Sequence, residues 1–143
     1  MWVPIRLDFD VAPNGNACDC NDDWKAHASM LYQGSDFSAS FSVSVGGLAA
    51  DFSGRTWDFR VFDKAKSAVI LELDNAHVVG DSAGRVSISI PAALTKDLIL
   101  GAPTRQLGGI NINDFIYSLD ATDASGGVVR VAEGVFVISR DVK

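Results

Sequence analysis

The clearest pattern in the chain is a strict alternation of apolar residues and serines that runs over nine residues, from Phe37 to Val45. A period of two is typical of a half-buried β-strand, because successive side chains point to opposite faces of a sheet. A second alternating segment covers residues 56–63, and a Gly46–Gly47 turn with a short edge segment separates the two. We therefore predict a hairpin across residues 34–63, with the two alternating strands as its arms. The predicted inward positions of the first arm are Phe37, Ala39, Phe41, Val43 and Val45, and those of the second arm are Trp57, Phe59 and Val61.

Other strand patterns occur before and after this segment, separated by turn residues such as Gly, Asn and Asp. A helix is favoured at residues 91–98, where Pro91 opens a segment of Ala, Leu and Lys that suits one or two turns. About eight short strands with this spacing predict an all-β fold, an immunoglobulin-like antiparallel β-sandwich with one short helix. The remaining predicted strands cover residues 3–10, 26–33, 67–74, 84–90, 114–120, 128–134 and 135–139.

The length of 143 residues fits a single core-forming domain. Residues 12–25 differ from the rest, because proline, asparagine, glycine and aspartate crowd a segment that is too polar to build a core. We therefore divide the chain into an N-terminal extension at residues 1–29, which holds the first strand and this Cys- and Asp-containing loop, and a β-sandwich at residues 30–143.

Charge limits the classes of partner. The chain holds 12 Lys and Arg against 18 Asp and Glu, a net charge of −6 at pH 7, and its basic residues are scattered. Nucleic-acid binding needs clustered Lys and Arg, so we expect no nucleic-acid partner. No apolar run approaches the roughly 18 residues of a membrane span, and the N-terminus lacks the basic and long apolar regions of a signal peptide. We expect a protein that is made in the cytoplasm and has no membrane partner.

The two cysteines do not make a metal site by their spacing. Cys18 and Cys20 stand one residue apart, whereas a zinc knuckle has two residues between its ligands, and the chain has no second cysteine pair. His27 is near them in sequence but does not complete a set of four ligands. The thiols remain free groups or cross-links to a neighbouring subunit, formed once an assembly leaves a reducing cytoplasm.

Three residues of the same loop have the spacing at which a calcium-binding EF-hand loop begins. The rest of that motif is missing, because Trp24 stands at the position of the turn glycine and Met30 at that of the bidentate glutamate. We therefore expect no metal and no cofactor. The three residues are Asp19, Asn21 and Asp23.

No pattern of nucleophile and base points to catalysis. A serine nucleophile needs a strained turn such as Gly-x-Ser-x-Gly, and neither Gly34–Ser35 nor Gly54 offers one. His77 lies in a strand-like apolar run, and sequence does not place two of the outward acids across a sugar as a glycosidase requires. We therefore expect a non-enzymatic protein. The acids are Asp51, Asp58, Asp63, Glu72, Asp74 and Asp81.

Six motifs follow one another in an order that resembles a known family of phage proteins. They are Gln-Gly-Ser-Asp-Phe at 33–37, Gly-Gly-Leu-Ala-Ala-Asp-Phe-Ser-Gly at 46–54, Thr-Trp-Asp-Phe-Arg-Val at 56–61, Gly-Arg-Val-Ser-Ile-Ser-Ile-Pro at 84–91, Phe-Ile-Tyr-Ser-Leu-Asp-Ala-Thr-Asp-Ala-Ser-Gly-Gly-Val-Val-Arg at 115–130, and Glu-Gly-Val-Phe-Val-Ile-Ser-Arg-Asp-Val at 133–142. In this order, residues 30–143 resemble the N-terminal β-sandwich of phage baseplate upper proteins and related tail-fibre anchors.

The resemblance implies a virion structural protein of the tail, baseplate, neck or capsid that docks onto other phage virion proteins and anchors fibres. It also implies a homo-oligomer or a multicopy subunit of a symmetric assembly, and it brings no catalytic residues. Members of that family continue into a receptor-binding portion, whereas this sequence stops at Lys143 and carries residues 1–29 in front. We therefore expect a stand-alone virion component.

We expect the partner contacts in the N-terminal extension, because it adds to a sandwich that is complete without it. For the apolar residues of the first strand, the alternative is packing in the domain's own sheet. A second hypothesis for function is a carbohydrate- or host-surface-binding module with Trp24 and Tyr32 as a stacking platform. The predicted contact residues are Trp2, Ile5, Leu7, Phe9, Cys18, Cys20 and Trp24.

Overall fold

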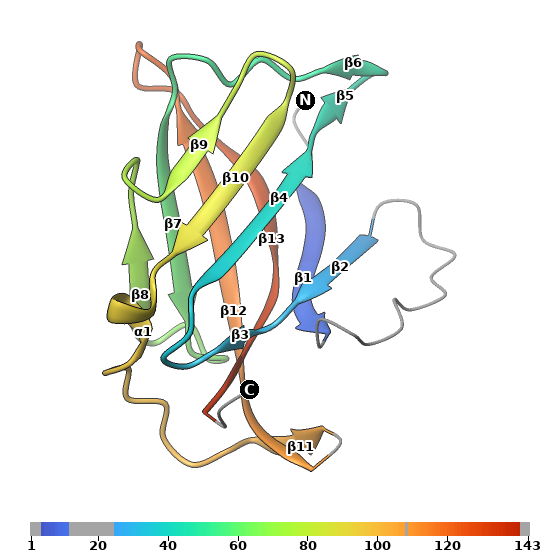
Figure 1. Cartoon of the computed structure of the whole chain (residues 1–143). Helices are drawn as coiled ribbons and strands as arrows, with labels where there is room; N and C mark the ends of the chain where they lie inside the picture. Colours follow the sequence, from blue (N-terminus) through green and yellow to red (C-terminus); the bar gives the residue numbers. More distant parts are fainter. Residues whose placement is uncertain (1–3, 12–24, 108, 141–143) are drawn as a thin grey trace.

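The computed structural model describes residues 4–11, 25–107 and 109–140, which form two β-sheets packed face to face (Figure 1). The strands of the larger sheet are β1 (Ile5–Val11), β2 (Lys25–Ser29), β3 (Leu31–Tyr32), β7 (Thr56–Phe62), β8 (Val69–Leu73), β11 (Arg105–Leu107), β12 (Ile110–Thr122) and β13 (Val128–Ser139). Those of the smaller sheet are β4 (Phe37–Ser42), β9 (Val78–Gly80) and β10 (Arg85–Ile90). A separate hairpin consists of β5 (Ser44–Val45) and β6 (Leu48–Ala49).

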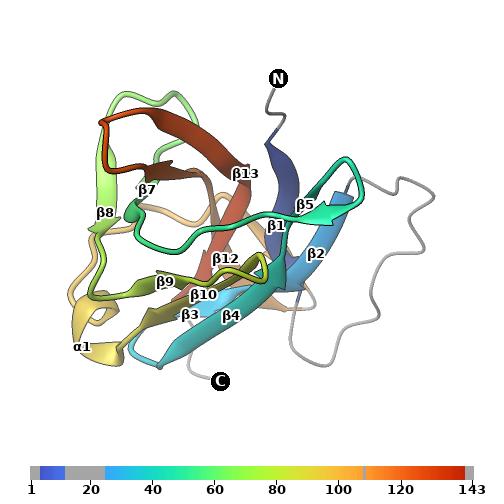
Figure 2. The same cartoon turned by 90° about the horizontal axis from the view of Figure 1, so that it is seen from above.

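The strand order places the N-terminal strands β1 and β2 beside the hairpin that β12 and β13 form. The larger sheet runs β2-β1-β13-β12-β7-β8, with β3 paired to the end of β13 and β11 to the start of β12. The smaller sheet runs β4-β10-β9. Seen from above, β4, β10 and β9 form one layer that lies across β12 and β13 (Figure 2). Both sheets therefore contribute one face to a shared core.

The prediction of an all-β sandwich with one short helix is confirmed. The helix α1 (Ala92–Thr95) is a single turn, shorter than the predicted segment, and no described helix is long and apolar enough to cross a membrane. Most strand pairs are antiparallel, but β1 is parallel to both β2 and β13, and β3 is parallel to β13. The two strands predicted at 128–134 and 135–139 are one continuous strand, β13.

The predicted hairpin over residues 34–63 is wrong in its pairing. Strand β4 pairs with β10 in the smaller sheet, whereas β7 pairs with β12 and β8 in the larger one. The Gly46–Gly47 turn joins β5 to β6. Alternation indicates which side chains face the core. Phe37 on β4 and Trp57, Phe59 and Val61 on β7 are buried, as predicted. It does not indicate the partner strand, because two strands in opposite sheets can face the same core.

The centre of the core is a cluster of aromatic rings that both sheets supply. The ring of Phe9 lies 5.6 Å from that of Phe37, 5.2 Å from Tyr117 and 5.3 Å from Phe136. Phe59 stacks on Tyr117 at 5.4 Å. These five rings come from β1, β4, β7, β12 and β13, so the cluster connects strands from almost the whole length of the chain.

Strand β1 is an interior strand of the larger sheet, which corrects the division of the chain at residue 29. It lies between β2 and β13, and its inward residues Leu7 and Phe9 are 4% and 0% exposed. Residues 5–11 and 25–29 are therefore parts of the sandwich and not an extension of a sandwich that is complete without them. The alternative interpretation, a first strand packed in the domain's own sheet, describes β1.

The close approach of β1 to β13 depends on Gly134. A Cβ at this position would come within 2.5 Å of both the Leu7 carbonyl oxygen and the Asp8 carboxylate. The Tyr117 hydroxyl donates a hydrogen bond of 2.5 Å to the same Leu7 carbonyl. Burial raises the pKa of Tyr117, so this hydroxyl keeps its proton and remains a donor. The glycine thus lets a buried side chain on β12 reach the backbone of β1.

We expect Phe9→Ala to lower the free energy of unfolding by about 3–5 kcal/mol, because the substitution leaves a cavity at the centre of the aromatic cluster. The measurement is chemical denaturation followed by tryptophan fluorescence. Ile99→Ala is the matched control, because Ile99 is 91% exposed and its truncation removes little buried surface. Equal stability of the two variants would show that β1 is not part of the folded core.

Candidate functional site

Four of the acids considered as catalytic groups instead hold turns in place. The Asp51 carboxylate accepts hydrogen bonds from the backbone and hydroxyl of Ser53, and the Asp63 carboxylate accepts them from Ser67. These bonds lower the pKa of both carboxyl groups. The other two acids, Asp74 and Asp81, accept from backbone N–H groups of the two turns that they begin. Each is an Asx-type turn that fixes the path of a loop.

The remaining two acids, Asp58 and Glu72, are brought together by an arginine. Arg60 Nη2 lies 2.7 Å from Asp58 Oδ2, and Arg60 Nε lies 2.7 Å from Glu72 Oε2. The pKa of Asp58 is raised overall, chiefly because partial burial disfavours the charged carboxylate. The positive charge of Arg60 opposes this shift, and the negative charge of Glu72 adds to it. A guanidinium that bridges both carboxylates makes an ion-pair network across β7 and β8 rather than a pair flanking a substrate bond.

The sequence does contain one Gly-x-Ser-x-Gly pattern, because residues 80–84 read Gly-Asp-Ser-Ala-Gly. The structure places them at the turn between β9 and β10, and Ser82 is exposed there. A nucleophile elbow instead joins a strand to a helix. His77, the histidine whose side chain is described, precedes β9, so the length of that strand separates it from Ser82. The turn therefore matches the letters of the motif without its geometry.

The described residues contain no group of three or more His, Cys, Asp or Glu side chains that could hold a metal ion. Of the two residues proposed as a stacking platform, Trp24 lies outside the described residues. Trp57 is a core residue, as predicted, and packs against Phe52 at a ring distance of 5.2 Å. Tyr32 is half-buried and packs against a small cluster of Met30, Ile112 and Val137.

The predicted partner-contact residues divide into two groups. Leu7 and Phe9 are core residues, so the hypothesis that they contact a partner is wrong. The Phe9 ring packs against Phe37 on β4 and Phe136 on β13. Ile5 is half-buried and packs against the same core. The other four, Trp2, Cys18, Cys20 and Trp24, lie outside the described residues.

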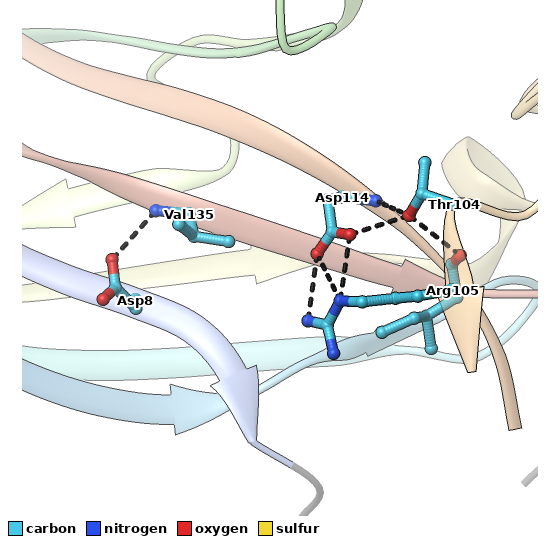
Figure 3. A network of polar contacts seen from close by, with 6 residues as sticks. Asp8, Thr104, Arg105, Asp114 and Val135 are labelled. Atoms are coloured by element: carbon cyan, nitrogen blue, oxygen red, sulfur yellow. Dashed lines mark hydrogen bonds and ion pairs between the residues drawn. The ribbon is translucent and has the colours of Figure 1, made fainter. Parts of the chain in front are cut away.

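The outer face of the larger sheet is held by polar contacts between neighbouring strands (Figure 3). Arg105 on β11 forms a two-point ion pair with Asp114 on β12, and the Thr104 hydroxyl donates to Asp114 at 2.7 Å. Asp8 on β1 accepts a hydrogen bond of 2.9 Å from the backbone N–H of Val135 on β13. The charged groups in these contacts are satisfied within the domain.

Exposed aliphatic side chains gather at the β5–β6 hairpin, which extends beyond the end of β4 (Figure 1). Val45 and Leu48 face each other across the hairpin next to its Gly46–Gly47 turn, and they are 45% and 75% exposed. Both turn glycines have positive φ angles, 61° and 82°, as a two-residue hairpin turn requires. The hairpin therefore ends in an apolar pair, here called the hairpin tip (Val45, Gly46, Gly47 and Leu48).

The base of this hairpin is fixed to the sandwich. The Val43 N–H donates to the Gly84 carbonyl at 2.8 Å, and the Ala50 N–H donates to the Val43 carbonyl at 3.0 Å. A Cβ on Gly84 would lie 2.3 Å from the Val43 carbonyl oxygen, so the close contact needs a glycine. Val43 itself is buried. The tip is thus an exposed apolar feature on a rigid base.

Sequence reasoning missed the hairpin tip because the alternation assigned Val45 to the inner face. A signal was present, since apolar residues directly beside a two-residue Gly-Gly turn must oppose each other at the end of a hairpin. The strand pattern gave no indication that the chain leaves the core after Val43.

Comparison of the sequence with models of known protein families finds no match, and a search for similar curated proteins finds none.

We expect Asp114→Asn to lower the free energy of unfolding by about 1 kcal/mol at neutral pH, because it removes the charge that Arg105 binds. Burial opposes ionisation of Asp114, but hydrogen bonds from Arg105 and Thr104 outweigh it and lower its pKa. A lowered folded-state pKa gives stability that is present above the unfolded value, near 4, and is lost as the pH falls through the folded value.

The difference between the parent protein and the Asp114→Asn variant should therefore be constant near neutrality and vanish in acid, as measured by denaturation at a series of pH values. Asp97→Asn serves as the control, because Asp97 is an exposed residue on the loop after α1. A difference that grows as the pH falls would contradict the assigned ion pair.

Proposed function

We propose that this protein is a non-enzymatic structural component of a bacteriophage particle that docks onto other virion proteins and secures a fibre. The order of motifs in residues 30–143 supports the phage assignment by its resemblance to tail-fibre anchor domains. In this proposal the protein is made in the host cytoplasm and functions in the virion. The observation that carries the docking role is the exposed apolar pair at the hairpin tip.

An exposed aliphatic pair on a rigid projection is suited to insertion into a pocket of another protein. Complete burial of a Val or Leu side chain contributes about 1.5–3 kcal/mol, so Val45 and Leu48 together supply a substantial part of a specific contact. The hydrogen bonds at Val43 and Ala50 hold the hairpin in place before binding. Little conformational entropy is then lost when the tip is bound.

Charges of both signs surround the hairpin. Exposed Asp51 lies close after it, and Asp81 lies near because its carbonyl accepts a hydrogen bond from Phe52 N–H. Arg55 lies near enough to Asp51 to lower the pKa of that carboxyl group. Exposed Arg85 pairs with Ser42 before the hairpin. A partner pocket with an apolar floor and a polar rim would complement this surface.

We expect the double variant Val45→Ser, Leu48→Ser to fold as the parent does and to be lost from assembled particles. Its affinity for the partner should fall about a hundredfold or more, because two aliphatic anchors are removed. The measurement is quantitative mass spectrometry of particles purified from cells that express this gene together with the genes that flank it.

The double variant Ile99→Ser, Val128→Ser is the matched control, since these side chains are 91% and 62% exposed and lie outside the hairpin. Particles that contain the hairpin variant at the parent's copy number would refute the docking role of the tip. Particles that lack even the parent protein would refute the virion assignment.

A further inference from the structure

Strand β4 is the outermost strand of the smaller sheet. It pairs with β10 on one side, and among the described residues no strand or backbone group pairs with its other side. Every second residue of an edge strand directs its N–H and C=O outward, so β4 presents a row of unused donors and acceptors. Figure 1 shows β4 in the front sheet, at the side away from β9.

Strand β4 itself lacks the sequence features that usually prevent pairing between proteins, and no described loop pairs with its outer side. Its sequence, Phe-Ser-Ala-Ser-Phe-Ser, contains no charge and no proline, and its register with β10 is continuous without a bulge. Natural sheets normally block such an edge with lysine, proline, a bulge or a covering loop. An uncharged strand whose outward backbone groups have no partner among the described residues is suited to the addition of another strand.

The sequence of β4 reads the same in both directions around Ala39. Residues 37–41 are Phe-Ser-Ala-Ser-Phe. If two copies of this strand lie antiparallel about a two-fold axis at Ala39, then Phe37 faces the partner's Phe41 and Ser38 faces the partner's Ser40. Each residue type thus meets its own type, and the axis requires the contact to be the same on both subunits.

We propose that β4 pairs with β4 of a second copy of this chain, so that two smaller sheets join into one continuous six-stranded sheet. The pairing preserves the faces of both sheets. Ser40 pairs with Ser87 on β10, and Ser38 pairs with Ser89, so a row of four serines runs across the new junction on the solvent side. On the core side, Ala39 meets Ala39, and the half-buried Phe41 gains an aromatic neighbour.

Nothing in the strand opposes this self-pairing electrostatically. The nearest charged residue before β4 is Asp36, which in this register faces the partner's Ser42 and not another acid. The Asp36 carboxylate also accepts a hydrogen bond from the Ala92 N–H at 2.8 Å. A chain with net charge −6 thus keeps its acids out of the proposed contact.

The proposed dimer does not depend on the virion function, but it would give that function a second docking point. Because the two β4 strands run antiparallel and each leads into a β5–β6 hairpin, the two hairpin tips lie at opposite ends of the joined sheet. A dimer would therefore present two docking points in opposite directions, which suits a subunit that bridges neighbours in a symmetric particle.

The first test measures the oligomeric state of the purified full chain by sedimentation velocity over a range of concentrations. The parent should dimerise. Ser38→Lys, Ser40→Lys should weaken the dimer by about tenfold or more, because two pairs of like charges then face each other across the axis. Ser38→Lys, Ser40→Glu should bind at least as tightly as the parent, because each lysine then faces a glutamate.

Both pairs of substitutions lie at exposed positions, so they report on the contact and not on folding. Circular dichroism confirms the fold of each variant. A parent that stays monomeric would overturn the proposal. A dimer whose affinity changes equally in the two variants, or in neither, would also overturn it, because such a dimer would form through another face.

The second test uses the two-fold axis itself. In a chain with Cys18→Ser and Cys20→Ser, Ala39→Cys should form an intermolecular disulfide when a mild oxidant such as diamide is added, because directly opposed residues of antiparallel strands lie within disulfide reach. Ser40→Cys in the same chain should cross-link much less, because it faces residue 38 of the partner. Equal yields, or none at residue 39, would exclude the proposed register.

Discussion

The structure depends on the burial of Phe9 against rings from three other strands, β4, β12 and β13. This residue lies near the N-terminus, and Phe136 and Tyr117, which touch it, lie near the other end of the chain. The hydrogen bond from Tyr117 to Leu7 joins residues 110 positions apart. β1 therefore cannot be placed until β12 and β13 are present, and the two ends of the chain stabilise each other. Such non-local contacts are typical of slowly folding β-sandwiches.

The faces of the strands could be predicted from the sequence, but not their partners. The period of two placed Trp57, Phe59 and Val61 in the core, and the structure confirms all three. The same period is compatible with several neighbours, so it did not show that β4 and β7 lie in opposite sheets. The position of β1 depends on a single glycine, Gly134, whose lack of a Cβ matters only once Leu7 lies against it. The need for a glycine at position 134 therefore cannot be recognised from the sequence, because it arises from a contact with a distant strand.

The candidate site residues show the same division between local and distant information. Asp51 and Asp63 are each followed by a serine whose N–H and hydroxyl they bind, a local pattern that predicts a turn from sequence alone. The exposure of Val45, by contrast, depends on the bonds of Val43 to Gly84 and Ala50, which lead the chain out of the sheet. Because Gly84 is far along the sequence, the alternation gave Val45 the wrong face.

Charge distinguishes the two outer faces of the sandwich and is consistent with the contacts proposed above. On the larger sheet each described arginine pairs with an acid on the same or a neighbouring strand, as Arg60 does with Asp58 and Glu72, and Arg130 with Asp120. These charges are paired within the domain and are partly exposed. The smaller sheet has no such network at β4, where the solvent-facing residues are serines and the edge is uncharged. The side of the molecule that contains β4 and the hairpin tip therefore combines backbone groups that are unpaired among the described residues with apolar surface, and both features favour protein association.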